Sequence, residues 1–320
     1  MIENRVTKLL NIKYPLICGA MYPCSNPELV AAVSREGGMG VIQPLSLIYV
    51  HRYDFREGVK KIIELSGGKS FGMNVIVEKS SQVYESRMRS WVDIALEMGC
   101  KFFVTALGDP SWVVQKVHAQ GGMVFHDVTE KKFALKGLDA GADGLICVNA
   151  RAGGHAGRKS PHDLYQELKD LNVPLVCAGG VSDQASYREA LEIGYEGVQM
   201  GTRFIASLEC TAHADYKSAI LKAKKEDIVL TERVTGVPLA VINTPYLQKV
   251  GTRTSFIGRF FLKNARTKHL ARLYYSALSF IRLKRSLFKE FSTKDFYQAG
   301  QSVERVSEVL SVESIFKNIV

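Results

Sequence analysis

The first 205 residues repeat one unit, which consists of a short apolar run, a loop, and a helical stretch ending in glycine. Four helix endings show it clearly: AAVSREGGMGVI (31–42), ALEMGCKFFV (95–104), GLDAGADGLICV (138–148) and ALEIGYEGVQM (190–200). Glycine suits the left-handed residue that follows a helix, and each stretch runs directly into the next apolar run. The alternation therefore predicts parallel strands joined by helices.

The apolar runs predict eight strands. They are YPLI (14–17), GVIQ (40–43), FGMNV (71–75), FFVTA (102–106), MVFHDV (123–128), GLICVN (144–149), PLVCAG (174–179) and GVQMG (197–201). They lack polar–apolar alternation, as expected for parallel strands covered on both faces. Eight such units predict a (β/α)₈ TIM barrel with its active site on the loops after the strands. A doubly wound open sheet is the alternative, but GAMYPCSN at 19–26 is not the GxGxxG fingerprint usual there.

The pattern changes beyond about residue 205. Residues 210–227 are predicted to form a helix, 229–245 a short extended excursion, and 270–291 basic, aromatic-rich helices. The tail at 299–320 carries apolar residues at helical spacing. We therefore expect three parts: a barrel at 1–208, a helical and basic cap at 209–298, and a C-terminal helix at 299–320 that packs back on the barrel.

The net charge of +10 comes from one segment, because residues 233–289 hold twelve Lys and Arg and no acidic residue. The rest of the chain has a net charge of −2. The segment is interpreted as a solvated helical surface, with a site for an anionic ligand or a membrane surface as the alternative. Its aromatic residues are interpreted as packing rather than base stacking, so no nucleic-acid partner is expected.

The six cysteines include no CxxC pair and no Cys/His cluster with metal-ligand spacing, so no metal site is predicted. Several of them end apolar runs, as buried reduced thiols of cytoplasmic proteins do. The N-terminal stretch lacks a signal-peptide pattern, and no apolar run is long enough for a transmembrane segment. We therefore expect a cytoplasmic protein.

The loops after the last two strands predict a phosphate site. Barrels often bind phosphate there through backbone N–H groups. Gly179, Gly180, Gly201 and Thr202 can supply those donors, and the threonine hydroxyl adds another. Tight turns that happen to contain glycine are the alternative.

Three other strand ends carry polar side chains. The amide of Asn74 offers both a donor and an acceptor, which suits a flat heteroaromatic ring, and Gln43 allows the same interpretation. A turn or capping role is the alternative for both. His126 and Asp127 end the fifth strand, where a core histidine is the alternative for His126.

His155 lies in NARAGGHAGRKS (149–160), the loop after the sixth strand and beside the predicted phosphate loops. An imidazole can accept a proton or donate a hydrogen bond to developing negative charge. The flanking glycines would let a cofactor ring lie against the backbone. Arg151 and Arg158 add charge that favours an anionic substrate. A surface-loop histidine is the alternative.

These stretches resemble the nitronate monooxygenase (2-nitropropane dioxygenase) family of FMN-dependent TIM barrels, related to flavin-dependent enoyl-ACP reductases. The resemblance rests on GAMYPCSNPELVAAVSREGGMGVI, FGMNV, AGGHAG, PLVCAGGVSD, GVQMGTRF and AGQSVERV, in that order along nearly the whole chain. It implies a catalytic His155 and an FMN cofactor. The predicted FMN contacts, with Gln43 and His126 added from the strand ends, are Ala20, Met21, Gln43, Asn74, His126, Gly153, Gly179, Gly180, Gln199, Met200, Gly201 and Thr202.

The resemblance implies oxidation of alkyl nitronates with O₂, with His155 binding the nitro group and removing the α-proton of a nitroalkane. An NAD(P)H-dependent FMN reductase of an enoyl thioester or quinone is the alternative. The basic segment suits this alternative, because an acyl carrier protein or a pyridine nucleotide is anionic. A third hypothesis is a non-catalytic, membrane-surface module that uses 270–291. Arg151 stands where the family often has an acidic residue, and His126 where it often has lysine, so the substrate stays open. The oligomeric state also stays open, a homodimer included.

Overall fold

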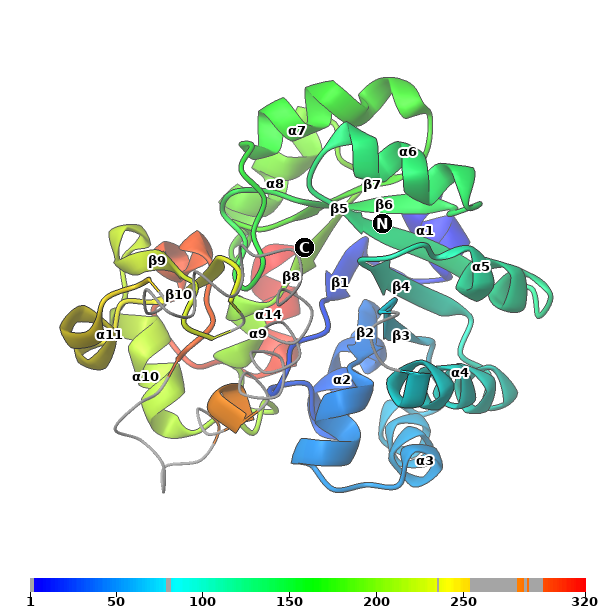
Figure 1. Cartoon of the computed structure of the whole chain (residues 1–320), viewed down its shortest axis with the longest axis horizontal. Coiled ribbons are helices and arrows are strands. Elements are labelled where there is room, and N and C mark those ends of the chain that lie inside the picture. The colour runs from blue at the N-terminus through cyan, green and yellow to red at the C-terminus, as the bar shows by residue number, and fades with distance from the viewer. Residues whose placement is uncertain (1–2, 79–81, 235, 254–280, 285–286, 288–295) are drawn as a thin grey trace.

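The computed structural model describes residues 3–78, 82–234, 236–253, 281–284, 287 and 296–320 (Figure 1). Eight parallel strands close into a barrel in which each strand pairs with the next along the chain and the last pairs with the first. The strands are β1 (Leu16–Cys18), β2 (Met39–Ile42), β3 (Phe71–Ile76), β4 (Phe102–Ala106), β5 (Met123–Val128), β6 (Gly144–Val148), β7 (Leu175–Ala178) and β8 (Gly197–Met200). The predicted TIM barrel is confirmed, because each predicted apolar run overlaps one of these strands.

Helices follow the strands and surround the barrel (Figure 1). Those of the barrel region are α1 (Arg5–Leu10), α2 (Pro27–Arg35), the π-helix η1 (Ser46–Val50), α3 (Phe55–Ser66), α4 (Gln82–Glu97), α5 (Ser111–His118), α6 (Lys131–Asp139), α7 (Pro161–Leu168), the short 3₁₀ helix η2 (Lys169–Leu171), α8 (Gln184–Ile193) and α9 (Thr202–Ile205). The predicted glycine endings are confirmed, since Gly37, Gly99, Gly141 and Gly194 have φ angles of +91°, +89°, +93° and +119°.

The barrel interior is apolar over most of its length. Residues that alternate along the strands, among them Ile17, Val104, Phe125 and Val176, pack together inside. α1 covers the amino-terminal end, where its Val6 is fully buried in the same cluster. The opposite, carboxyl-terminal end is called the mouth below, and it is the end at which barrels of this kind bind their ligands.

The region after the barrel folds beside β8, at the left of Figure 1. Residues 210–227 contain the predicted helix as α10 (Ala214–Lys222) and the 3₁₀ helix η3 (Lys225–Asp227). Residues 229–245 overlap an antiparallel pair, β9 (Ile228–Thr231) and β10 (Leu239–Ile242), followed by α11 (Pro245–Val250). The division of the chain into barrel, cap and tail remains our proposal.

The tail contains two helices rather than one, η5 (Gln301–Arg305) and α14 (Val312–Ile319). α14 starts separately because Ser311 caps it and the carboxylate of Glu209 accepts the Val312 N–H at 2.9 Å. Phe316 of α14 then packs against the rings of Tyr14 and Phe204.

Most of the predicted helices at 270–291 lie outside the described residues, of which only 281–284 and 287 fall there. The charge distribution of the basic segment is therefore known from the sequence alone. Among the described helices, none combines the length and apolar character that crossing a membrane requires.

Candidate active site

The mouth begins with a layer of four inward-facing residues. In a closed, tilted barrel, alternate strands contribute side chains at one height. The strand register places Gly19, Asn74, Asp127 and Ala178, at the ends of β1, β3, β5 and β7, in one such layer. Glycine and alanine have no polar side chain, so Asn74 and Asp127 are the two polar members of this layer.

Asn74 has the clearest signature of a ligand contact. Its side chain is 8% exposed. No described residue forms a hydrogen bond with its amide, although buried amides are normally paired. The floor beside it is formed by Gln199, whose side chain fills the place where a Cβ on Gly19 would lie, at 3.0 Å. An amide with free donors and an acceptor is therefore available at the mouth.

Asp127 is the second polar member of the layer. Its Oδ1 is buried and has no hydrogen-bond partner among the described residues. Its partner in register on β6, Ile146, is apolar, and β4 ends at Ala106 beside it, one residue beyond the Thr105–His126 pair. Burial raises the pKa of this carboxyl group to about 7. The sequence places Asp127 at a strand end, but the predicted cofactor contact is its neighbour, His126.

The side chain of His126 points outward from the barrel, toward α6. Its Nδ1 lies 2.8 Å from Thr105 Oγ1, and its ring packs against Gly137 of α6, where a Cβ would come within 2.7 Å. Burial lowers its pKa to about 4. Adjacent residues of a strand face opposite sides, and Phe125 and Asp127 take the inner side here. The prediction of His126 as an FMN contact is therefore corrected, because it is a core histidine between strands and helix.

Three more predicted contacts have structural roles. The Oε1 of Gln43 accepts the N–H groups of Leu45 and Ser46 at 2.6 and 3.3 Å, which is the capping role. The side chain of Met200 packs into the outer core. Met21 already donates its backbone N–H to Ser25 Oγ at 2.9 Å. Beside it, Ala20 lines the interior with a backbone that remains available.

The predicted phosphate donors lie together after β7 and β8. No described acceptor receives the backbone N–H groups of Gly179, Gly180, Gly201 or Thr202. The Thr202 hydroxyl accepts the N–H of Gly300 at 3.0 Å, which leaves its own proton free to donate. Unpaired N–H groups of this kind suit an anion.

His155 follows β6 in a loop attached to the cap. Gly154 forms a bridge with Ala240 of β10, with N–H···O distances of 3.2 and 2.7 Å. The His155 side chain is exposed, yet the surrounding protein still lowers the pKa of its imidazole by desolvation. A lowered pKa favours the neutral ring, which can accept a proton.

Residues 297–301, called the strap below, connect the loops of the mouth. The strap was expected to begin a helix and was not identified as part of the site. Its hydrogen bonds join Gln298 Nε2 to Tyr22 O (3.0 Å), Gly300 N to Thr202 Oγ1 (3.0 Å) and Gln301 N to Arg151 O (2.9 Å). The loops after β1, β6 and β8 are thereby held to one segment of the chain.

The strap also explains why Gly153 and Gly300 are glycines. A Cβ on Gly300 would lie 2.5 Å from Arg151 O, and one on Gly153 would lie 2.8 Å from Gly300 N. Two backbones touch here, whereas the sequence analysis predicts a cofactor contact for Gly153 and no role for Gly300. The stretch AGQSVERV is the sequence signal for this contact, because it includes Gly300 in a family motif that follows the barrel strands by about 100 residues along the chain.

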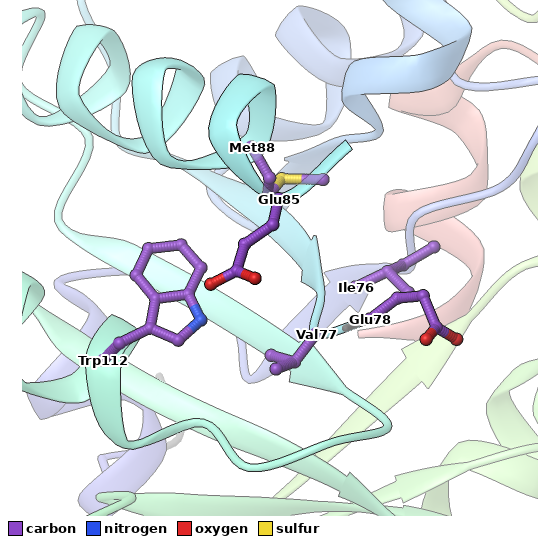
Figure 2. Close-up of a pocket in the computed structure, with 6 residues that line it drawn as sticks. All are labelled: Ile76, Val77, Glu78, Glu85, Met88 and Trp112. Atoms are coloured by element: carbon purple, nitrogen blue, oxygen red, sulfur yellow. The ribbon is translucent and has the colours of Figure 1, made fainter. Parts of the chain in front are cut away.

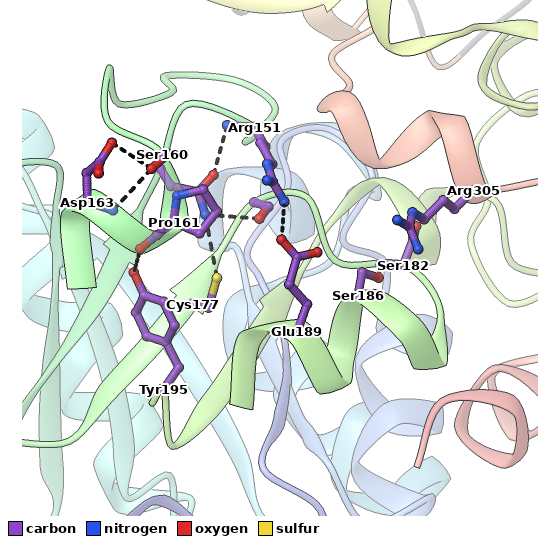
Figure 3. Close-up of polar contacts among 12 residues, drawn as sticks. Arg151, Ser160, Pro161, Asp163, Cys177, Ser182, Ser186, Glu189, Tyr195 and Arg305 are labelled. Carbon is purple, nitrogen blue, oxygen red and sulfur yellow. Dashed lines mark hydrogen bonds and ion pairs between the residues drawn. The ribbon is translucent and has the colours of Figure 1, made fainter. Parts of the chain in front are cut away.

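Arg151 points away from the mouth. Its Nη1 lies 2.9 Å from Glu189 Oε1 of α8, and Figure 3 shows the pair on the outer side of β7. The charge expected to attract an anionic substrate is thus paired with a carboxylate.

A small pocket lies where β3, α4 and α5 meet (Figure 2). Its wall includes Ile76 at the end of β3, Glu85 and Trp112. Arg89 binds Glu85 at 2.7 Å and stacks on the Trp112 ring at 4.2 Å. These contacts satisfy the polar groups of the pocket, so the unsatisfied groups of the mouth remain the better candidate site.

The mouth fits a flavin nucleotide. A flat ring with alternating donors and acceptors matches the free amide of Asn74, and a phosphate matches the four free N–H groups. The two kinds of group lie on opposite parts of the same barrel end, β3 and β7–β8.

Comparisons with known proteins agree with this fit. A probable nitronate monooxygenase of Staphylococcus saprophyticus is 28% identical over 312 residues, covering 84% of this chain and 86% of the relative. FabK from Thermotoga maritima has a TM-score of 0.81 at 27% identity, over 100% of this chain and 95% of FabK. Nitroalkane oxidase from Streptomyces ansochromogenes shares the fold, with a TM-score of 0.74 at 19% identity over 98% and 95% of the chains.

The family described as nitronate monooxygenase matches residues 3–320. Because this match includes every residue that the structure describes, the chain belongs to the nitronate monooxygenase family and is a flavin-dependent oxidoreductase.

Proposed function

We propose that this protein binds FMN at the barrel mouth and oxidises alkyl nitronates with O₂. The observation that carries the proposal is the set of hydrogen-bonding groups there that have no partner among the described residues, above all the amide of Asn74 and the four loop N–H groups. Such groups cost stability when they have no ligand, so their concentration at one end of the barrel indicates what they bind.

Asn74 and the backbone near Ala20 and Gln199 would hold the ring, and the loops at Gly179–Gly180 and Gly201–Thr202 would hold the phosphate. Gly153 would contribute backbone from the other side of the mouth. When bound, FMN supplies the electron transfer from substrate to O₂. The protein binds and orients the two reactants, and the strap keeps the loops around them in place.

His155 would act on the substrate. With its pKa lowered, the imidazole is neutral at physiological pH, and a ring nitrogen can take the α-proton from a neutral nitroalkane. The resulting imidazolium would then donate a hydrogen bond to the anionic nitronate. A nitronate supplied directly needs only the second of these roles.

Anaerobic mixing of the FMN-loaded protein with propionate 3-nitronate tests the proposal. Bleaching of the flavin absorbance by the nitronate alone is the expected result. A protein that cannot be loaded with FMN, or whose flavin the nitronate leaves oxidised, would contradict the proposal.

The likeness to FabK supports a second candidate, an NAD(P)H-dependent FMN reductase of an enoyl thioester or quinone. The same experiment separates the two, with NADH and NADPH each mixed separately with the protein. Rapid bleaching by either nucleotide, without bleaching by the nitronate, would favour the reductase.

A further inference from the structure

Asp127 is an acidic group that the proposed chemistry does not use. It faces the interior from β5, in the same layer as Asn74, at the floor of the mouth. Its Oδ1 is buried and unpartnered in the described part of the chain. An ionised carboxylate in such a place would need a cation or several donors, and no described residue donates a hydrogen bond to this Oδ1.

We propose that Asp127 belongs to the cofactor site and binds the FMN ring as a neutral carboxylic acid, donating its proton to a ring carbonyl oxygen. The inference rests on the proposed FMN site and adds a pH-dependent contact to it. A neutral acid and an amide then line one floor, and both can donate to a ring whose pyrimidine edge carries two carbonyl oxygens.

The surroundings favour the neutral form. Ala106 of β4 and Ile146 of β6 flank Asp127 and offer no donor side chain. Burial raises the pKa of the carboxyl group to about 7, so that near neutral pH a large share is protonated even before a ligand covers it. Covering it with a ring removes more water and favours the acid further.

The titratable groups around it are neutral in the relevant range. Burial raises the pKa of the Cys147 thiol on β6 well above its ordinary value, and the Asp127 carboxylate adds to that effect. His126 on the same strand has a pKa of about 4, and burial also lowers the pKa of His155 in the loop after β6. Between pH 7 and 9 these groups do not change charge, which leaves Asp127 to titrate.

The test measures the dissociation constant of FMN from pH 6 to 9 by flavin fluorescence. The wild-type affinity is expected to fall about tenfold or more between pH 7 and 9, since the proton must be taken up again for binding. Asp127→Asn, which keeps the shape and a donor, is expected to bind with nearly constant affinity over that range. Asp127→Ala, a second variant, should also lack the pH dependence and bind more weakly at pH 6.

Asp139→Asn is the control for net charge. Asp139 ends α6 and is exposed, so this variant should keep the wild-type pH profile. A wild-type affinity that is constant or rises with pH, or an unchanged slope in Asp127→Asn, would overturn this inference while leaving the FMN site intact. Absence of FMN binding at every pH would instead overturn the proposed function and this inference with it.

Discussion

The two ends of the barrel differ in the polarity of their buried side chains. At the amino-terminal end, Val6 of α1 and Phe102 of β4 are buried in a wholly apolar cluster. At the mouth, Asp127 has a buried carboxylate oxygen without a partner, and the amide of the buried residue Asn74 forms no hydrogen bond with a described residue. A fold selected for stability alone would make both ends like the first. The difference indicates that the mouth is complete only with a ligand.

The largest expected effect concerns His155. In His155→Asn, kcat/KM for a neutral nitroalkane is expected to fall by about 10²–10⁴, because proton removal loses its base. The loss for a preformed nitronate should be much smaller, since no proton is removed. Steady-state oxygen consumption with both substrates measures the difference.

The stability of the His155→Asn variant should stay within about 0.5 kcal/mol of wild type, as expected for an exposed side chain. An equal loss for both substrates would show that His155 binds the nitro group without acting as a base. Unchanged kinetics would remove it from the mechanism.

The amino-terminal end should show the reverse pattern. Phe102 packs edge-on against Phe125 at 5.3 Å, and Phe102→Ala is expected to lower the free energy of unfolding by about 3–5 kcal/mol. FMN affinity, measured where the variant is folded, should change less than about twofold, because several layers separate the cavity from the mouth. Urea titration and flavin fluorescence provide the two measurements.

Phe102→Leu is the milder companion variant and should lose less stability with the same unchanged affinity. A large loss of FMN binding in the leucine variant would show that the two ends are coupled, against the comparison made above.

The next effect comes from the outward face of β5. His126 has a pKa of about 4 when folded, below the ordinary 6.5, so the unfolded chain binds its proton first. Its contribution to stability is complete above about pH 6.5 and is lost as the pH falls toward 4, by up to about 3 kcal/mol. The free energy of unfolding should therefore depend less on pH in His126→Asn than in wild type across this range.

The exposed His162 offers a matched control, and His162→Asn should keep the wild-type slope. If the free energy of unfolding depended on pH equally in both variants, other groups would account for the loss of stability in acid. The packing of His126 against α6 would then not set its protonation.

His126 and Asp127 show where prediction from the sequence ends. The strand itself was predicted correctly, since β-branched runs and helix-ending glycines such as Gly141 are local signals. Which of two adjacent residues faces the interior depends on the register of the whole barrel. The resemblance to the family indicates a polar residue at this strand end. That Asp127, and not His126, points inward follows only from the strand register of the closed barrel.

The strap shows a second limit. Gly300 is a glycine because it touches Arg151 and Gly153, which are about half the chain away. Its apolar neighbours predicted a helix, and no local signal marks a crossing of two backbones. Likewise, Arg151 was assigned to the mouth by its place in the loop, whereas its partner Glu189 lies on a helix that the loop sequence does not reveal.

The smallest effect on stability, and the most informative, is expected from Asn74→Leu. Removing an amide that has no hydrogen-bond partner among the described residues should change the free energy of unfolding of the FMN-free protein by less than about 1 kcal/mol, because no hydrogen bond within the protein is lost. FMN binding should weaken at least about tenfold, the value of about one lost hydrogen bond to the ring. Thermal or urea unfolding without FMN measures the stability, and fluorescence titration with FMN measures the affinity.

Asn74→Asp, similar in size, serves as the control for shape, and it should lose affinity mainly where the new carboxylate is ionised. If Asn74→Leu instead destabilised the FMN-free protein by several kcal/mol, the amide would have a structural partner, and the polarity of the mouth would no longer indicate a ligand.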